Sequence, residues 1–120
     1  MPDESLLVDK FAPGVQGHGV ICLKGPLTLE TRSVFQSAVR SENAHTIFLD
    51  LTDVPYVDSA GLGSLVSAHI TLHKSGHHLV LSGVNARVLK LIEITRVDSL
   101  FLMFATLDDA LQAIGNSARA

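Results

Sequence analysis

The chain has 120 residues, of which 47% are hydrophobic, and its formal net charge is −3 at pH 7. This length favours a single domain, residues 1–120, with a core at about 4–115 and a tail at 116–120. Without a Lys/Arg cluster, direct nucleic-acid binding is not expected, and no apolar run is long enough to cross a membrane. The single Cys22 excludes an internal disulfide, and the acidic start is not a secretion signal, so a cytoplasmic location is expected.

The first half of the chain predicts three strands and one helix. Leu6–Phe11 and Gly19–Leu23 are separated by the turn-forming APGVQGHG, which suits an antiparallel pair. His45–Leu51 is a nearly continuous apolar run, typical of a strand that is buried on both faces. Helical spacing begins at Thr28, which is the expected N-cap. The apolar positions assigned to this helix are Leu29, Val34, Phe35, Ala38 and Val39.

The second half predicts three further helices. Pro55 ends the preceding strand, and a helix is expected from Ser59 to Gly76, where glycine suits a left-handed C-cap. The later elements are a strand at 78–84, a helix at 85–96 with Asn85 as N-cap, a strand at 100–105 and a helix at 107–115 capped by Thr106. This alternation predicts an α/β fold with a small mixed, mostly parallel sheet of four to five strands and about four helices. Ser59 falls at a carboxyl end of the strands, where such folds meet their partners.

Ser59 lies in the stretch VPYVDSAGLGSL, and its hydroxyl allows several roles. As an N-cap it would contribute about 1 kcal/mol to helix stability. A nucleophilic role is disfavoured, because DSAGLG is not a G-x-S-x-G motif and His69 would lie roughly 15 Å away along the helix. The glycines match neither a dinucleotide fingerprint nor a Walker motif. We therefore expect no catalytic residue, no cofactor and no enzyme activity.

Phosphorylation is the third role that Ser59 could have. A phosphate would add about −1.5 to −2 charges beside Asp58 and close to Asp50 and Asp53. At about 6 Å and an effective dielectric constant near 20, each like-charge pair costs roughly 3 kcal/mol before screening. The modification would therefore repel a docked protein while leaving the fold intact. Gly61 and Gly63 fit this interpretation if they keep the surface low for a partner.

Four histidines after the serine have spacings that resemble those of metal ligands. His69 and His73 are one turn apart on the expected helix, but no cysteine and no nearby acid completes a set. His69 lies on the apolar stripe and is expected to pack, whereas His73, His77 and His78 are expected to be solvated. No metal site is predicted.

Two segments of the chain resemble a known family. The motif D-L-x-x-V-x-Y-V-D-S-A-G-L-G and the later LVLSGVNARVLKLIEITRVDSLF resemble the STAS domain of bacterial anti-sigma factor antagonists. The resemblance implies a STAS fold and a partner that is both an anti-sigma factor and an ATP-dependent serine kinase, with a phosphatase that reverses the modification. It places the phosphorylation site at Ser59. The implied partner-binding residues are Asp58, Ser59, Ala60, Gly61, Leu62, Gly63, Asp53 and Thr28.

One element departs from the family pattern. The acidic G-E-L-D at the end of the second strand is replaced here by GPLT, residues 25–28, so that Pro26 and Thr28 stand in place of the two acids. Thr28 could be a second phosphoacceptor or an ordinary N-cap. A monomer or weak dimer is expected. The alternatives that stay open are a STAS scaffold subunit of a stress-sensing assembly and an accessory STAS protein of a lipid or small-ligand pathway.

Overall fold

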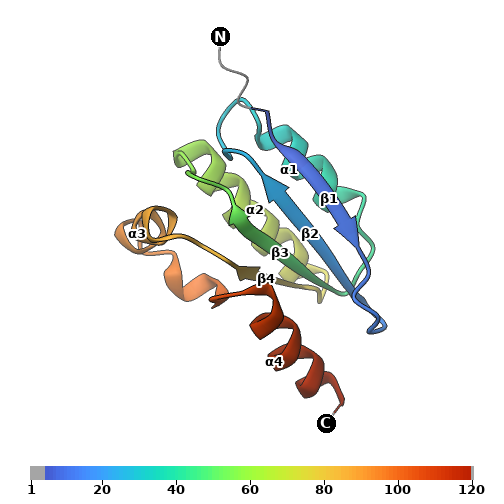
Figure 1. Ribbon diagram of the computed structural model, residues 1–120. Coiled ribbons are helices and arrows are strands. Elements are labelled where there is room, and N and C mark those ends of the chain that lie inside the picture. Colours follow the sequence, from blue (N-terminus) through green and yellow to red (C-terminus); the bar gives the residue numbers. More distant parts are fainter. Residues whose placement is uncertain (1–4, 120) are drawn as a thin grey trace.

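A five-stranded sheet in the order β1-β2-β3-β4-β5 runs through the centre of the computed structural model, which describes residues 5–119 (Figure 1). The strands are β1 (Leu7–Phe11), β2 (His18–Lys24), β3 (Thr46–Asp53), β4 (His78–Ser82) and β5 (Leu102–Phe104). β1 pairs antiparallel with β2, and every later pair is parallel. The predicted mixed sheet is confirmed. Residues 1–4 and 120 of the predicted domain and tail lie outside the described residues.

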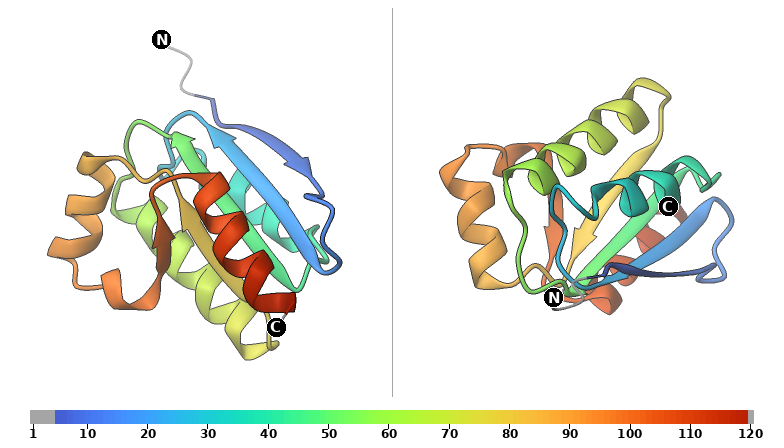
Figure 2. Two further views of the ribbon diagram at one scale, coloured as in Figure 1. Left: turned by 60° about the horizontal axis from the view of Figure 1, so that its bottom comes forward. Right: turned by 90° about the horizontal axis from the view of Figure 1, so that it is seen from above.

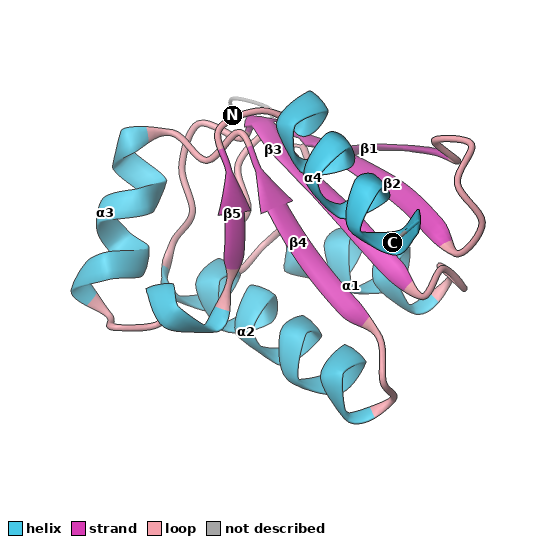
Figure 3. Cartoon of the chain, turned by 90° about the horizontal axis from the view of Figure 1, so that it is seen from below, coloured by secondary structure: helices cyan, strands magenta, loops and turns pink. Residues whose placement is uncertain are grey.

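Four helices cover this sheet, as predicted. They are α1 (Arg32–Arg40), α2 (Ser59–Lys74), α3 (Ala86–Ile94) and α4 (Leu107–Arg119), with a 3₁₀ turn, η1, at Asp98–Leu100. α1 and α2 lie on one face, α4 lies on the other, and α3 lies beside the β5 edge (Figures 2 and 3). The last strand is shorter than predicted because Leu100 belongs to η1, and Phe101 and Ala105 lie just outside the strand. The last helix continues through most of the predicted tail.

The strand side chains divide between two cores, one on each side of the sheet. On β3, Ile47 and Leu49 pack toward α1 and α2, whereas Phe48 between them packs toward Ala110 of α4. All three β3 side chains are fully buried. This alternation follows from the two-residue repeat of a strand, and it confirms that β3 is buried on both faces.

The first helix begins three residues later than predicted, because a hydrogen-bonded turn precedes it. The Thr31 hydroxyl donates to the Pro26 carbonyl oxygen at 2.8 Å and accepts from the Thr28 N–H at 2.9 Å. The N-cap of α1 is Thr31, not Thr28. The prediction of Thr28 as N-cap is therefore wrong, since residues 28–31 form a turn that side-chain hydrogen bonds stabilise.

Two apolar residues that were assigned to the buried stripe of this helix are exposed instead. Leu29 is 54% exposed and Val34 is 41% exposed, whereas Phe35 and Ala38 are buried as predicted. Leu29 precedes the helix, so helical periodicity does not decide its direction. Val34 is adjacent to Phe35 and therefore points about 100° away from it around the helix axis.

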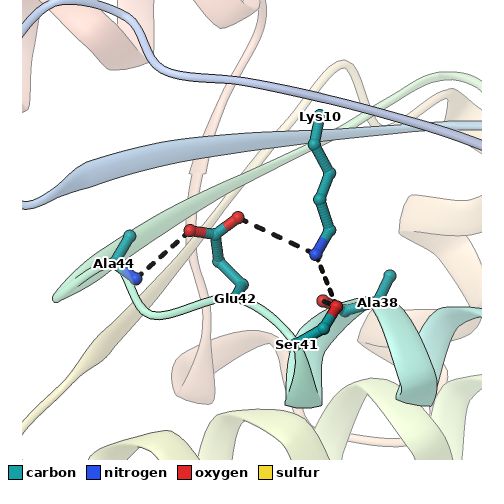
Figure 4. A network of polar contacts seen from close by, with 5 residues as sticks. All are labelled: Lys10, Ala38, Ser41, Glu42 and Ala44. Atoms are coloured by element: carbon teal, nitrogen blue, oxygen red, sulfur yellow. Dashed lines mark hydrogen bonds and ion pairs between the residues drawn. The ribbon is translucent and has the colours of Figure 1, made fainter.

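Polar contacts fix β1 against the end of α1. The Lys10 ammonium donates to the Ser41 hydroxyl at 2.7 Å and lies 3.9 Å from Glu42, whose other oxygen accepts from the Ala44 N–H (Figure 4). Lys10 reaches these residues because it is on the α1 side of β1, opposite to the exposed Leu7. These contacts attach the antiparallel edge strand β1 to the segment that follows α1.

The predicted roles of Gly76, Asn85 and Thr106 at the helix ends are confirmed. Gly76 follows α2 with a φ of 77°, Asn85 Oδ1 accepts from the Val88 N–H at 2.8 Å, and the Thr106 hydroxyl accepts from the Asp109 N–H at 3.1 Å. Each of these contacts satisfies backbone groups that a helix end leaves without an internal partner. Within residues 5–119, no helix combines the length and the apolar character that a membrane span requires.

Replacing Arg96 by glycine is expected to raise the free energy of unfolding by about 0.5–1 kcal/mol. Arg96 has a φ of 62° and follows α3 in the left-handed position, where a Cβ atom is unfavourable and glycine is not. Urea denaturation measures the change. Arg96→Ala is the matched control, since it removes the side chain but keeps the Cβ; an equal gain in that variant would contradict the backbone explanation.

Candidate functional site

The loops that follow β2 and β3 are joined by backbone hydrogen bonds at the carboxyl ends of these two parallel strands. The Gly25 N–H donates to the Asp53 carbonyl at 3.0 Å, and the Leu27 N–H donates to the Tyr56 carbonyl at 3.2 Å. The Leu27 carbonyl in turn accepts from the Asp58 N–H at 3.2 Å. Because these hydrogen bonds join the two loops, they form one surface at the start of α2, where Figure 1 shows the loops side by side.

Asp58 is the N-cap of α2, and Ser59 is the first residue of the helix. One Asp58 carboxylate oxygen accepts from the Gly61 N–H at 2.7 Å, and the other accepts from the Leu29 N–H at 3.1 Å. The interpretation of Ser59 as N-cap is therefore wrong. The aspartate takes that position because its two oxygens can reach the helix start and the adjacent loop together.

The Ser59 side chain is exposed, so it does not need to leave the core to meet another protein. Asp53 is also exposed, and Asp58 and Ala60 are partly exposed. A hydroxyl at this place, next to Asp58 in the chain, can accept a phosphoryl group that a kinase supplies, and the added charge would stay on the surface.

Three residues of the predicted contact set lie inside the fold. Leu62 is 5% exposed and belongs to the core, and Thr28 is 7% exposed. The Thr28 hydroxyl also donates to Glu30 at 3.2 Å. Gly61 is buried. Thr28 is therefore poorly placed as a second phosphoacceptor, and none of the three offers a side chain to a partner's surface.

Gly61 and Gly63 have different environments. A Cβ on Gly61 would overlap the Leu27 carbonyl oxygen and approach Val57 Cγ1 at 3.1 Å, whereas a Cβ on Gly63 would meet no atom within 4 Å. Gly61 therefore allows close packing between α2 and the β2–α1 loop, and does not lower the outer surface as predicted. Only Gly63 faces solvent.

Leu29 is a surface residue that the sequence did not point out as part of this site. Pro26, Leu27 and Thr28 are all buried, so the GPLT segment that replaces the acidic element presents little of itself to a partner. Leu29 comes next, is 54% exposed, and has its N–H held by Asp58. The five-residue spacing from Leu29 to Val34 does not fit a 3.6-residue repeat, and this was the signal that Leu29 precedes the helix.

The loop after β4 completes the surface. The Asn85 side-chain amide donates to the Val54 and Pro55 carbonyls at 3.2 and 3.1 Å while its oxygen caps α3. The Arg87 guanidinium lies 5.1 Å from the centre of the Tyr56 ring, within the range of a cation–π contact. These contacts fix the third loop against the loop that carries Asp58 and Ser59.

Cys22 lies on β2 and is partly buried. Burial raises the pKa of its thiol, and the negative charges of Asp50, Asp9 and Asp53 raise it further. A raised pKa keeps the thiol protonated at neutral pH, which is the opposite of what a nucleophilic cysteine requires.

The four histidines after Ser59 have ring contacts with other histidines, and His69 also contacts Phe101. The His69 and His73 rings are stacked with centroids 5.9 Å apart, and His69 also meets the Phe101 ring edge-on at 5.7 Å. His73 and His78 are exposed as predicted, while His77 is partly buried against His45. Among residues 5–119, no group of three or more potential metal ligands comes together.

Replacing Asp58 by alanine is expected to lower the free energy of unfolding by about 2 kcal/mol, because both the helix cap and the bond to Leu29 are lost. Asp58→Asn is the matched control. Its single carbonyl oxygen still caps the helix, so about half of the loss should be recovered. Urea denaturation of both variants measures the difference, and equal stability of Asp58→Ala and the unmodified protein would show that the cap contributes nothing.

Comparison with known proteins places this geometry in context. The chain is 47% identical over 47 residues to an anti-sigma-B factor antagonist of Listeria monocytogenes, a match that covers 39% of this chain and 41% of that protein. The crystal structure of an anti-sigma factor antagonist from Mycobacterium paratuberculosis superposes with a TM-score of 0.81 at 23% identity, covering 93% and 96% of the two chains. The phosphorylated form of the Bacillus cell fate determinant SpoIIAA gives 0.65 at 17% identity, covering 90% and 99%.

The two structural matches show that the fold is shared, and the Listeria match adds sequence similarity over about two fifths of each protein. The sequence profile of the STAS domain matches residues 10–110, which include every element from the end of β1 into α4. The chain therefore belongs to the STAS domain family.

Proposed function

We propose that the protein is an anti-sigma factor antagonist, and that phosphorylation of Ser59 prevents it from binding its partner. The observation that carries the proposal is the exposed Ser59 hydroxyl at the start of α2, on the surface that the β2–α1, β3–α2 and β4–α3 loops form together. The similarity to a protein named anti-sigma-B factor antagonist supports the partner class. The related fold that is known in a phosphorylated form supports the modification.

The proposed partner is an anti-sigma factor that is also an ATP-dependent serine kinase. Binding of the unphosphorylated protein would occupy this partner and free the sigma factor. The kinase would then transfer the γ-phosphoryl group of ATP to the Ser59 oxygen, with release of ADP and of the hydroxyl proton. A phosphatase would restore the hydroxyl by hydrolysis.

The position of Asp58 explains why the added phosphate would act on the partner rather than on the fold. Asp58 already holds the Gly61 N–H at the start of α2, so the phosphoryl group cannot take that hydrogen bond without displacing the cap. The group would remain on the exposed side of the helix start, beside the Asp58 carboxylate. A partner that covers this surface would have to desolvate both negative charges.

Leu29 is the proposed apolar contact on the same surface. The GPLT residues that stand in place of the family's acids are mostly buried, so they offer little to a partner. Leu29 follows them and is exposed, and it would make an apolar contact where the family's acids would make a charged one. The partner should therefore offer an apolar pocket next to the place where it receives Ser59.

The test of the proposed function is phosphate transfer from labelled ATP by candidate kinases from the same genome. Unmodified protein and Ser67→Ala should be labelled, and Ser59→Ala should not. Ser67 is the matched control because it is also an exposed serine of α2. Equal labelling of Ser59→Ala and the unmodified protein would refute Ser59 as the phosphorylation site.

A further inference from the structure

A cavity of about 320 Å³ lies at the other end of α2 and of the sheet, away from Ser59. It exists because β5 has three residues and pairs only with Val80–Ser82, so the first two residues of β4 have no strand beside them at that edge. Figure 3 shows β4 continuing past the end of β5, between the layers of α2 and α4. The cavity therefore occupies the place that a longer last strand would fill.

Much of the cavity wall is apolar. Leu79 and Leu100 contribute to it, together with Leu102 of β5 and Ile114 of α4. Leu100 is 39% exposed and Leu102 is 51% exposed, so apolar surface faces water here. Burial of such surface by a hydrocarbon group is favourable, and a volume near 300 Å³ is within the range of small-molecule sites.

The rest of the wall carries four imidazoles. His69 and His73 come from α2, and His77 and His78 come from the start of β4. Every one of these rings offers an N–H donor, and a histidine that gains a proton also becomes a cation. Aspartate and glutamate are absent from the described residues that line the cavity, so an incoming anion would meet no like charge on its wall.

We propose that this cavity binds an aliphatic carboxylate, with the hydrocarbon chain against the leucines and the carboxylate at the imidazoles. The two halves of the wall correspond to the two halves of such a ligand: apolar side chains for the chain and N–H donors for the oxygens. The site is separate from the Ser59 surface, so it does not depend on the proposed switch.

Titration calorimetry with octanoate, acetate and octanol tests both halves of the recognition. Octanoate should bind at least tenfold more tightly than acetate, which lacks the chain, and than octanol, which lacks the charge. The double variant His73→Gln/His78→Gln should weaken octanoate binding at least tenfold. Leu102→Glu, which places a negative charge at the cavity mouth, should abolish it.

Lys74→Gln is the control variant, because it removes a positive charge from the same end of α2 at a residue that does not line the cavity. It should bind octanoate as the unmodified protein does. His73, His78 and Leu102 are all exposed, so these variants should fold, and circular dichroism verifies this. Equal affinity for octanol and octanoate, or full affinity in the double variant or in Leu102→Glu, would overturn the proposal. So would binding that requires added Zn²⁺.

Discussion

Replacing Ser59 by glutamate is expected to weaken binding to the proposed anti-sigma partner by about a hundredfold, while the free energy of unfolding changes by less than about 0.5 kcal/mol. A hundredfold loss corresponds to about 2.7 kcal/mol. This is the size expected when one more negative charge beside Asp58 must be desolvated in an interface. The fold is expected to tolerate the change because the side chain is exposed and a negative charge is favourable at a helix N-terminus.

The matched control is Ser59→Gln, which has nearly the size of glutamate without its charge. Binding by calorimetry should fall much less in Ser59→Gln than in Ser59→Glu, and the difference between them should shrink at high salt if repulsion causes it. If both variants lose binding equally, size and not charge is responsible, and the electrostatic mechanism fails. Enzymatically phosphorylated protein should bind more weakly than Ser59→Glu, because phosphate carries close to two charges.

Replacing Gly61 by alanine is expected to lower the free energy of unfolding by about 2–3 kcal/mol. The new methyl group would overlap the Leu27 carbonyl oxygen, and a backbone atom that is itself hydrogen-bonded cannot move aside cheaply. The same substitution at Gly63 meets no atom, so it should raise stability by about 0.5–1 kcal/mol through the better helix propensity of alanine.

Thermal and urea unfolding of the two variants measures this contrast directly. Because both glycines lie in the first turn and a half of α2, differences in helix propensity largely cancel between them. What remains is the contact between α2 and the β2–α1 loop. A Gly61→Ala variant as stable as Gly63→Ala would show that α2 and the β2–α1 loop are not in close contact, and the single surface proposed for partner binding would have to be abandoned.

The fold was predictable because its signals are periodic. The continuous apolar run at His45–Leu51 and the alternation of strands with helices determine a parallel sheet, and turn residues between Leu6–Phe11 and Gly19–Leu23 determine the antiparallel pair. Even so, periodicity does not give the ends of elements. The turn at residues 28–31 has the same residue types as a helix start, and only its side-chain hydrogen bonds to Pro26 and within the turn distinguish it.

The site was partly predictable, because the order of strands and helices gives the position of Ser59 in the fold. Ser59 was expected at a carboxyl end of the strands, and its exposure agrees with that expectation. The sequence could not decide between Asp58 and Ser59 as the N-cap, since both residue types are good caps. Nor could it show that Gly61 faces the fold, because the contact is with Leu27, thirty-four positions earlier in the chain. Long-range contacts of this kind leave no local pattern.

The hydrogen bonds from Gly25, Leu27 and Leu29 to the β3–α2 loop have a thermodynamic consequence for recognition. Two loops that are already fixed to each other have little conformational entropy left to lose when another protein covers them. Complex formation can then be fast and can be reversed by a modest energetic change, since no ordering of these loops precedes it. The proposed phosphorylation of Ser59 would be a change of that size.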